Sequence, residues 1–433
     1  MQAPEPPKEP LTGELGNQAR QVCLIGASVR SAAESAKRAG YEVFAVDRYG
    51  DRDTLAVCRR HILLPDLEQN KIADFEGFLA EVAVWVRSMP FLIVGGMKSA
   101  HRLLDALPLN ERDLSQERSR RNARTLEVLR RACDETDFDF PPTRGMNEFL
   151  SKPNQFPFSE RGESWLIKKP DYCGGLGVRW VNGEDLTRQP EEFASGYLQK
   201  WIPGRLYGTS LLSNGLEVAV IGTCRGRFTR RGSLPFVYCG SVGPVPIETS
   251  THHAILEVGK RLVRETGFRG IFNLDWIQAD SGQKWLIEIN PRWSAAVELL
   301  ERAWNEQIAV TREMTSSTSI MHWVLSALNG CPLSSLMGLS SSSVDPRLHA
   351  TSASSFYKRV VFSKQTRLFD PRCLRIQLHS GESLHDLPSR PVELNAGDPI
   401  CTVIGPWRAG EIEQARHRYR QLVVEIARGH SLT

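Results

Sequence analysis

The stretch FNLDWIQADSGQKWLIEINPRW (272–293) decides the fold of this chain. It reads as two strands joined by a turn at Asp280-Ser281-Gly282. Glu288 and Asn290 are two residues apart, so their side chains leave the same face of one strand. Asp275 lies where the partner strand can bring it opposite them. Carboxylate and amide oxygens are ligands that suit Mg²⁺, so this face predicts a metal site.

Arg292 adds a guanidinium to the same edge, where it can hold a phosphoryl or carboxylate group with two hydrogen bonds. An ordinary solvated strand face would also alternate polar and apolar residues. The apolar Trp285, Ile287 and Ile289 are regular enough to predict a core-facing side. The ordered Glu-Asn-Arg series on the other side therefore favours a built site.

A second candidate site is WLIKKPDYCGGLGVRW (165–180), where a strand ends in Lys168 and Lys169. The chain has 12 lysines in 433 residues, so an adjacent pair needs a reason. Strand alternation puts one lysine of the pair on a ligand face. A glycine-rich loop brings backbone N–H groups close to phosphate oxygens, although a structural hairpin is an equal alternative. Its glycines are Gly174, Gly175 and Gly177.

The N-terminal region reads as strand, helix and strand over 21–27, 31–40 and 42–47, which is a βαβ unit of a parallel sheet. Gly26 and Asp47 stand where a dinucleotide-binding fold places its first glycine and its ribose-binding acid. The loop lacks the second and third glycines of that motif. This favours a Rossmann-like domain without NAD, and a nicotinamide-dependent oxidoreductase is the lesser alternative.

Four motifs in order resemble the ATP-grasp superfamily: Lys169-Pro170 with its glycine loop, YLQKWIPG (197–204), LDW (274–276) and IEINPR (287–292). The resemblance spans about residues 20–310. More narrowly, the chain resembles predicted ATP-dependent carboligases related to biotin carboxylase. Some relatives of that kind accompany one-carbon metabolism based on tetrahydromethanopterin and methylofuran.

The resemblance implies that the chain uses ATP with Mg²⁺, or Mn²⁺ in its place. Lys169 would contact the α- and β-phosphates under the glycine loop, and Arg292 would steady the transferred phosphoryl group or the substrate carboxylate. These two residues are the expected catalytic pair. The residues expected to meet adenine are Gln199, Lys200, Trp201 and Ile202, and those expected to hold the metal are Asp275, Glu288 and Asn290.

The chain departs from the family pattern in three places. Lys200 and Arg205 replace acidic residues near the ribose. The upstream phosphate-binding lysine is missing, so Arg121 or Arg124 would have to replace it. The segment VELNAGDPICTV (392–403) resembles half of a biotinyl-type barrel without its Met-Lys-Met, which predicts a structural cap without covalent biotin.

The predicted fold class combines α/β and α+β units: a Rossmann-like domain before the ATP-grasp core, that core, and a small C-terminal β-rich domain. No apolar run is long enough for a membrane span, which together with nine cysteines lacking a CxxC pair predicts a cytoplasmic protein. The predicted units are a disordered tail (1–19), the Rossmann-like domain (20–145), the ATP-grasp domain (146–312), a helix and Ser-rich linker (313–349) and a β-rich cap with a closing helix (350–433).

The predicted activity is ligation of a small carboxylate to an amine through an acyl phosphate, forming a C–N bond and releasing ADP and phosphate. Such chemistry needs charge neutralisation and alignment rather than a protein nucleophile. The alternatives are a bicarbonate-using carboligase that forms carboxyphosphate and a regulatory protein that binds ATP without turnover. The net charge of +4 argues against a nucleic-acid or membrane partner, and a homodimer is compatible with the resemblance.

Overall fold

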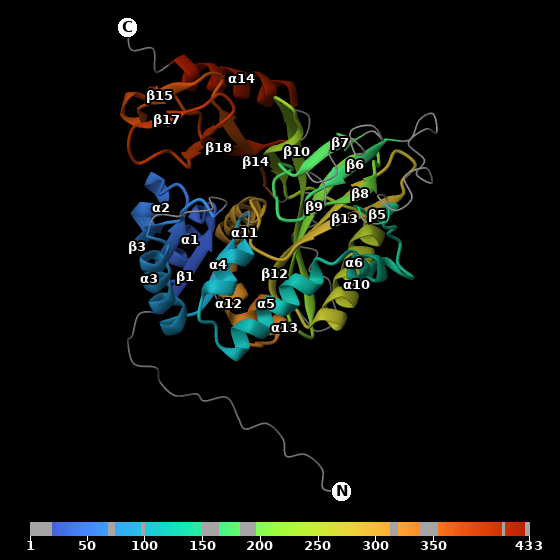
Figure 1. The fold of residues 1–433 in the computed structure, drawn as a ribbon. Helices are drawn as coiled ribbons and strands as arrows, with labels where there is room; N and C mark the ends of the chain where they lie inside the picture. Colours follow the sequence, from blue (N-terminus) through green and yellow to red (C-terminus); the bar gives the residue numbers. More distant parts are fainter. Residues whose placement is uncertain are drawn as a thin grey trace, which may run out of the picture.

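The computed structural model describes residues 20–67, 74–96, 100–146, 148, 164–181, 196–311, 319–337, 354–408 and 412–428. The predicted tail (1–19) and most of the Ser-rich linker lie outside these residues. Figure 1 shows the N-terminal elements on one side of the chain, the central sheets beside them and the C-terminal elements above. No helix among the described residues is long and apolar enough to cross a membrane.

The N-terminal unit contains a parallel sheet of four strands in the order β3-β2-β1-β4, as the βαβ pattern predicts. Both faces of β1 are buried: Val22 and Leu24 pack with residues of α1, and Cys23 and Ile25 pack with residues of α3. The elements are β1 (Gln21–Gly26), α1 (Arg30–Arg38), β2 (Glu42–Asp47), α2 (Arg52–Val57), β3 (Cys58–Leu63), α3 (Phe75–Ser88), β4 (Phe91–Val94) and α4 (Ala100–Ala106).

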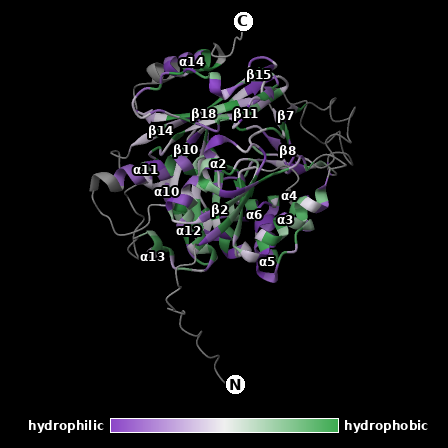
Figure 2. Cartoon of the chain, turned by 90° about the vertical axis from the view of Figure 1, so that its left-hand side faces the viewer, coloured by the Kyte–Doolittle hydropathy of each residue, from purple (hydrophilic) through white to green (hydrophobic). Residues whose placement is uncertain are grey.

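The arginine-rich stretch over 115–135 lies in two helices, α5 (Glu111–Ala123) and α6 (Leu126–Cys133). The interruption comes from Thr125, whose side chain accepts a hydrogen bond from the backbone N of Val128 and caps α6. Figure 2 shows α5 as a mainly hydrophilic helix. The break leaves Arg124 between the two helices rather than on a helix face.

A small antiparallel sheet has the strand order β5-β8-β6-β7. One of its faces packs Trp165 and Ile167 against Met146 and Leu198. Because side chains alternate along β6, Lys168 leaves the opposite face. The strands are β5 (Thr143–Gly145), β6 (Trp165–Lys168), β7 (Val178–Val181) and β8 (Tyr197–Lys200).

The large sheet has eight strands in the order β13-β12-β9-β10-β11-β14-β18-β16. The predicted boundary at residue 350 does not separate two sheets, because β14 pairs with β11 and carries the C-terminal strands into the same sheet. Its strands are β9 (Arg205–Asn214), β10 (Val218–Arg231), β11 (Leu234–Gly243), β12 (Arg269–Gln278), β13 (Lys284–Asn290), β14 (Ser355–Phe362), β16 (Ser383–His385) and β18 (Pro399–Trp407).

Helices cover this sheet. Leu262 of α10 packs with Phe272 of β12, and Leu300 of α11 packs with Ile221 of β10. At the C-terminal end, Leu422 of α14 packs with Val403 of β18. The remaining elements are α10 (Thr249–Thr266), α11 (Val297–Thr311), α12 (Ile320–Leu328), α13 (Leu333–Met337), β15 (Arg367–Phe369), a 3-10 turn (Pro371–Cys373), β17 (Val392–Leu394) and α14 (Ile412–Arg428).

A buried ionic network joins the N-terminal unit, α11 and the C-terminal strands. Both terminal nitrogens of Arg30 donate to Glu298 at 2.7 Å, and its Nε donates to Asp386 at 2.6 Å. Lys358 Nζ donates to the same Glu298 carboxylate at 2.8 Å. Burial would raise the pKa of Glu298, but Arg30 and Lys358 hold that pKa well below its usual range.

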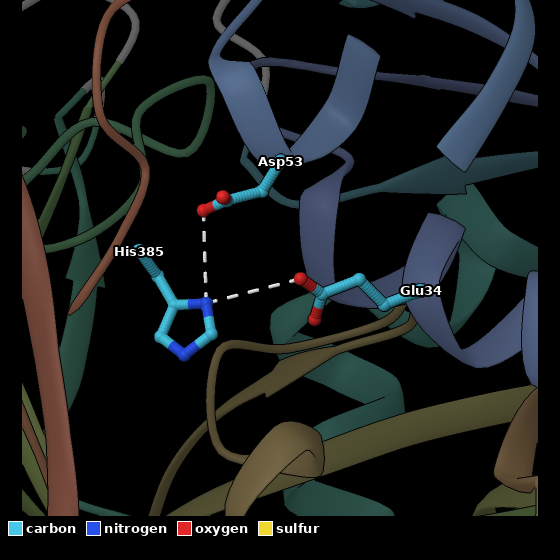
Figure 3. A group of neighbouring side chains, drawn as sticks. All are labelled: Glu34, Asp53 and His385. Carbon is cyan, nitrogen blue, oxygen red and sulfur yellow. Dashed lines mark ion pairs between the residues drawn. The ribbon is translucent and has the colours of Figure 1, made fainter. Parts of the chain in front are cut away.

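The edge of this network is a cluster of Glu34, Asp53 and His385, which point toward one another in Figure 3. His385 Nδ1 lies 3.8 Å from a Glu34 oxygen and 3.6 Å from an Asp53 oxygen. Arg30 Nη1 donates to the other Glu34 oxygen at 3.0 Å. A protein guanidinium therefore already supplies positive charge here, and the cluster serves as part of the junction.

Glu298→Gln should destabilise the protein by about 3–5 kcal/mol, because it removes the negative charge that the buried cations Arg30 and Lys358 share. Chemical denaturation followed by circular dichroism measures the change. The control is Glu127→Gln, which removes an exposed carboxylate that pairs with Arg131 on the surface of α6. That control should leave the free energy of unfolding almost unchanged, and equal losses in the two variants would contradict the role given to the junction.

Candidate functional site

The predicted carboxylates meet on the hairpin of β12 and β13, where Asp275 pairs directly with Glu288. The expected alternation of Trp285, Ile287 and Ile289 into the core is wrong in detail. The register shifts between Asp275 and Trp276, so Leu286 and Ile289 are the buried apolar residues of β13. This bulge adds one residue to β13 and still leaves Glu288 opposite Asp275.

Hydrogen bonds tie the predicted metal ligands together. Asn290 Nδ2 donates to Asp275 Oδ2 at 2.8 Å and to Glu288 Oε1 at 3.1 Å. Arg292 Nη2 donates to Asn290 Oδ1 at 3.0 Å. The structure thus brings Asp275, Glu288, Asn290 and Arg292 into one group, with the oxygen of Asn290 turned toward Arg292.

The two lysines of the pair differ in their surroundings. The side chain of Lys168 is only 6% exposed, and Glu288 and Asp275 are the charges that act on it. Among the described residues, no group lies within hydrogen-bonding or ion-pairing distance of its ammonium. Lys169 follows the strand, and its backbone N–H donates to the carbonyl of Gly177 at 3.0 Å. Both lysines line the same cavity, so the phosphate contact predicted for Lys169 stays a prediction.

The glycine loop rests on β11. The backbone N of Tyr238 donates to the carbonyl of Gly174 at 2.9 Å. Gly175 has a φ of +78°, and a Cβ there would lie 1.6 Å from the carbonyl oxygen of Phe236. Only glycine allows this close approach. The ring of Phe236 also stacks with Trp201 at 5.3 Å between centroids, so the small sheet and β11 meet through an aromatic contact.

The cavity is lined by the lysine pair, the glycine loop, the carboxylate hairpin and Arg124. Arg124 Nη2 donates to the carbonyl of Pro170 at 2.5 Å, while Arg121 pairs with Glu117 and Asp105 outside the cavity. The lining residues are Arg124, Leu129, Lys168, Lys169, Pro170, Tyr172, Cys173, Gly174, Gly175, Gly177, Val178, Tyr197, Glu288, Ile289 and Asn290.

The predicted adenine contacts, residues 199–202, are described but are not part of this lining. The Gln199 side chain is directed elsewhere and donates to Thr143 Oγ1 at 3.1 Å. Trp201 packs against Phe236 and, at 5.1 Å between centroids, against Trp180. Adenine contact by this segment stays a prediction for its backbone groups.

Burial shapes the charges of the site. Burial first, and then the neighbouring Glu288 carboxylate, raises the pKa of Asp275 well above its usual value. Burial also acts to raise the pKa of Glu288, but Lys168 and the hydrogen bond from Asn290 hold it below its usual range. Burial lowers the pKa of Lys168, against the pull of the two carboxylates. Of the two carboxyl groups, Asp275 is therefore the one that keeps its proton to the higher pH.

The dinucleotide reading of the N-terminal domain finds no support in the geometry around Asp47. This carboxylate is fully buried and accepts from the backbone N of Gly50 at 2.9 Å. His61 Nε2 lies 2.8 Å from the same oxygen, and the backbone N of Val29 lies 3.5 Å from the other. Groups of the N-terminal domain therefore already surround the carboxylate of Asp47, which would have to bind the ribose of a dinucleotide.

Sequence reasoning missed Asn273 and did not assign Lys168 or Arg124 a definite place in the site. Asn273 stands two residues before Asp275, so strand alternation alone could have placed it on the same face. Lys168 could have been found from the apolar alternation of β6, which leaves its side chain opposite Ile167. Arg124 was one of two alternatives, and only the break between α5 and α6 distinguishes it from Arg121.

Residues 130–296 match the family model described as an ATP-grasp domain. This chain therefore contains an ATP-grasp domain. The match begins within α6 and ends just before α11, so it includes the lysine pair, the glycine loop and the carboxylate hairpin. An uncharacterized protein of Methanocaldococcus jannaschii is 18% identical over 394 residues, covering 88% of this chain and 87% of that protein.

Solved structures share the fold over nearly the whole chain. A biotin carboxylase domain of the Hydrogenobacter thermophilus 2-oxoglutarate carboxylase, in complex with MgADP, ADP and bicarbonate, is 14% identical with a TM-score of 0.62 over 92% of this chain and 89% of that one. An L-amino acid ligase from Bacillus licheniformis is 15% identical with a TM-score of 0.60, covering 94% and 97%. An N5-carboxyaminoimidazole ribonucleotide synthetase in complex with ADP is 15% identical with a TM-score of 0.59, covering 93% and 97%.

Divalent-cation binding at Asp275 and Glu288 should strengthen as pH rises. Because the pKa of Asp275 is raised, this carboxyl keeps its proton to higher pH than usual, and a cation that binds must displace that proton. Calorimetric titration of Mn²⁺ in buffers of different ionisation enthalpy should show binding that weakens, and proton release that increases, as the pH is lowered. Binding that releases no proton at any pH would contradict the raised pKa of Asp275.

Proposed function

We propose that the protein is an ATP- and Mg²⁺-dependent ligase that joins a small carboxylate to an amine through an acyl phosphate. One observation carries this proposal: the buried ammonium of Lys168, without a hydrogen-bonding partner among the described residues, faces the same cavity as Glu288 and the glycine loop. A buried cation without a partner is costly unless an anionic ligand completes it. The triphosphate of ATP is an anion of the right kind.

The residues that line the cavity support different roles in binding the triphosphate of ATP. Lys168 and Lys169 would balance phosphate charge from the strand end, and Arg124, which donates to the carbonyl of the adjacent Pro170, would do so in place of the missing upstream lysine. Backbone groups of the glycine loop would cover the phosphates, because glycines leave no side chain in the way. Asp275 and Glu288 would hold Mg²⁺, with Asn290 as a further ligand after its amide turns its oxygen inward. Bound there, Mg²⁺ would neutralise phosphate charge during transfer.

Arg292 would act on the transferred group. Its side chain lies beside Asn290 and donates to the carbonyl of Trp293 at 3.3 Å. In the proposed reaction a substrate carboxylate oxygen attacks the γ-phosphorus, the bond to the β-phosphate oxygen breaks, and ADP leaves. The amine then attacks the acyl carbon, loses a proton to solvent, and releases phosphate. Arg292 would hold the carboxylate or the phosphoryl oxygens in line during the first step.

The acceptor would approach from the N-terminal domain. Val94 at the end of β4 forms a parallel bridge with Trp293, and the backbone N of Gly95 donates to the Trp293 carbonyl at 3.2 Å. Trp293 Nε1 also donates to Ser31 Oγ at 3.0 Å. These contacts hold the carboxyl edge of the parallel sheet against the loop that carries Arg292, and such an edge is where open α/β sheets bind ligands.

A bicarbonate-using carboligase is the second candidate, because two of the similar structures are a biotin carboxylase and a carboxyaminoimidazole ribonucleotide synthetase. In that reaction bicarbonate would be the attacking carboxylate and carboxyphosphate the intermediate. Release of ADP that depends on bicarbonate alone would identify it. Release that depends on an organic carboxylate, with an amide found by mass spectrometry, would identify the first candidate.

Glu288→Gln should abolish ADP release, because it removes an anionic metal ligand while keeping the shape of the side chain. A coupled assay with pooled carboxylates and amines measures it, and unfolding temperature checks the fold. Unchanged turnover would contradict the metal assignment. If the wild-type protein binds ATP tightly yet forms no ADP with any pool, the regulatory alternative replaces the ligase.

The lysine pair offers a matched comparison. Lys168→Ala should weaken ATP binding about tenfold or more, because the buried ammonium faces the carboxylates and cavity, and a charge-assisted contact is worth about 1.5–3 kcal/mol. Lys169→Ala should also weaken ATP binding if Lys169 makes the phosphate contact that the family resemblance assigns to it. Calorimetry with a nonhydrolysable ATP analogue measures both. Unchanged affinity in both variants would contradict the placement of the phosphates.

A further inference from the structure

Asn273 lies beside Asp275 and Asn290, although it is not one of the residues expected to hold the metal. It stands two residues before Asp275 on β12 and pairs across the hairpin with Asn290. Its side chain is only 5% exposed. The strand therefore places a second buried amide beside the same carboxylate that Asn290 contacts.

The contacts of Asn273 dictate how its amide must face. Nδ2 donates to Asp275 Oδ1 at 2.5 Å, and Oδ1 accepts from Ser210 Oγ at 3.2 Å. A carboxylate accepts hydrogen bonds, so the amide nitrogen must face Asp275 and the amide oxygen must face Ser210. Ser210 is itself fully buried on β9, which gives the amide a fixed anchor.

The neighbouring strand leaves the pair little freedom. A Cβ on Gly208 would lie 3.0 Å from Asn273 Nδ2 and 3.0 Å from Asp275 Oδ1. The amide and carboxylate therefore fill the space above this glycine, where they are packed against β9. Each oxygen of Asp275 has one amide donor, Asn273 on Oδ1 and Asn290 on Oδ2.

The two amides are not equivalent. Asn290 divides its donors between Asp275 and Glu288 and gives its oxygen to Arg292. It would have to turn to offer that oxygen to a metal. Among the charged groups of the described residues, Asn273 forms a hydrogen bond to Asp275 alone, so this bond can persist when a cation binds. A carboxylate oxygen that accepts one N–H retains a lone pair for a metal.

We propose that Asn273 is a positioning residue that fixes the Asp275 carboxylate for the divalent cation, an inference that rests on the proposed function. Without this amide, Oδ1 loses its anchor and the carboxylate can rotate about its terminal bond. Partners that orient a metal ligand typically change metal affinity by about 10–100-fold when they are removed. A purely structural asparagine would change stability and leave that affinity unaltered.

The test measures Mn²⁺ affinity directly, by electron paramagnetic resonance of free Mn²⁺ in the presence of ADP. Asn273→Ala should weaken Mn²⁺ binding by about 10–100-fold. The matched control is Asn214→Ala at the far end of β9, where an equally buried asparagine (6% exposed) bonds to Glu217 and the Cys331 carbonyl. That control should lose comparable stability and bind Mn²⁺ like the wild type.

A wild-type Mn²⁺ affinity in Asn273→Ala would overturn the inference. Should that variant fail to fold, Asn273→Ser carries the same test, because serine keeps a polar group for Ser210 but is too short to hold Asp275. Comparison with Glu288→Gln distinguishes a failure of the positioning role of Asn273 from a failure of the proposed function. If Glu288→Gln loses Mn²⁺ and Asn273→Ala keeps it, only the positioning role fails; if both keep it, the metal site and the proposed function fail together.

Discussion

The pairing of β12 with β13 is the constraint on which the rest of the site depends, because it sets two carboxylates opposite each other inside the protein. Asp275 and Glu288 cannot both be charged there without compensation. The chain supplies it from three directions: the amides of Asn273 and Asn290, the ammonium of Lys168, and Arg292 at the end of the hairpin. Each of these partners lies on a different strand or loop. The two carboxylates of the hairpin are therefore the point at which these parts of the chain meet.

The second requirement of the cavity is a covering loop whose backbone can approach a neighbouring strand closely. The glycine loop meets it by lying against the backbone of β11, where Gly175 contacts the Phe236 carbonyl. On the other side, the bridge between Val94 and Trp293 holds the N-terminal sheet against the hairpin. The ionic junction around Arg30 and Glu298 holds the same domain to the C-terminal strands. The cavity thus depends on contacts from every unit of the chain.

Much of this arrangement could be predicted from sequence, because strand alternation and residue order are local properties. The parallel N-terminal sheet, the facing of Asp275 and Glu288, and the ATP-grasp domain are confirmed by the structure and the comparisons. The bulge in β13, the break that frees Arg124 and the burial of Lys168 were not predicted in this way. The bulge and the burial of Lys168 depend on a register shift and on packing between sheets, which are tertiary effects that one sequence does not reveal. The break depends on the cap at Thr125, a local signal that the interpretation of the sequence did not use.

The most direct test of the account is a crystal structure of the protein with Mg²⁺ and a nonhydrolysable ATP analogue. The account predicts that the triphosphate lies between the glycine loop and the hairpin, with the ammonium of Lys168 on a phosphate oxygen and the metal on Asp275 and Glu288. A nucleotide bound elsewhere, for example at the loop between Gly26 and Asp47, would contradict it.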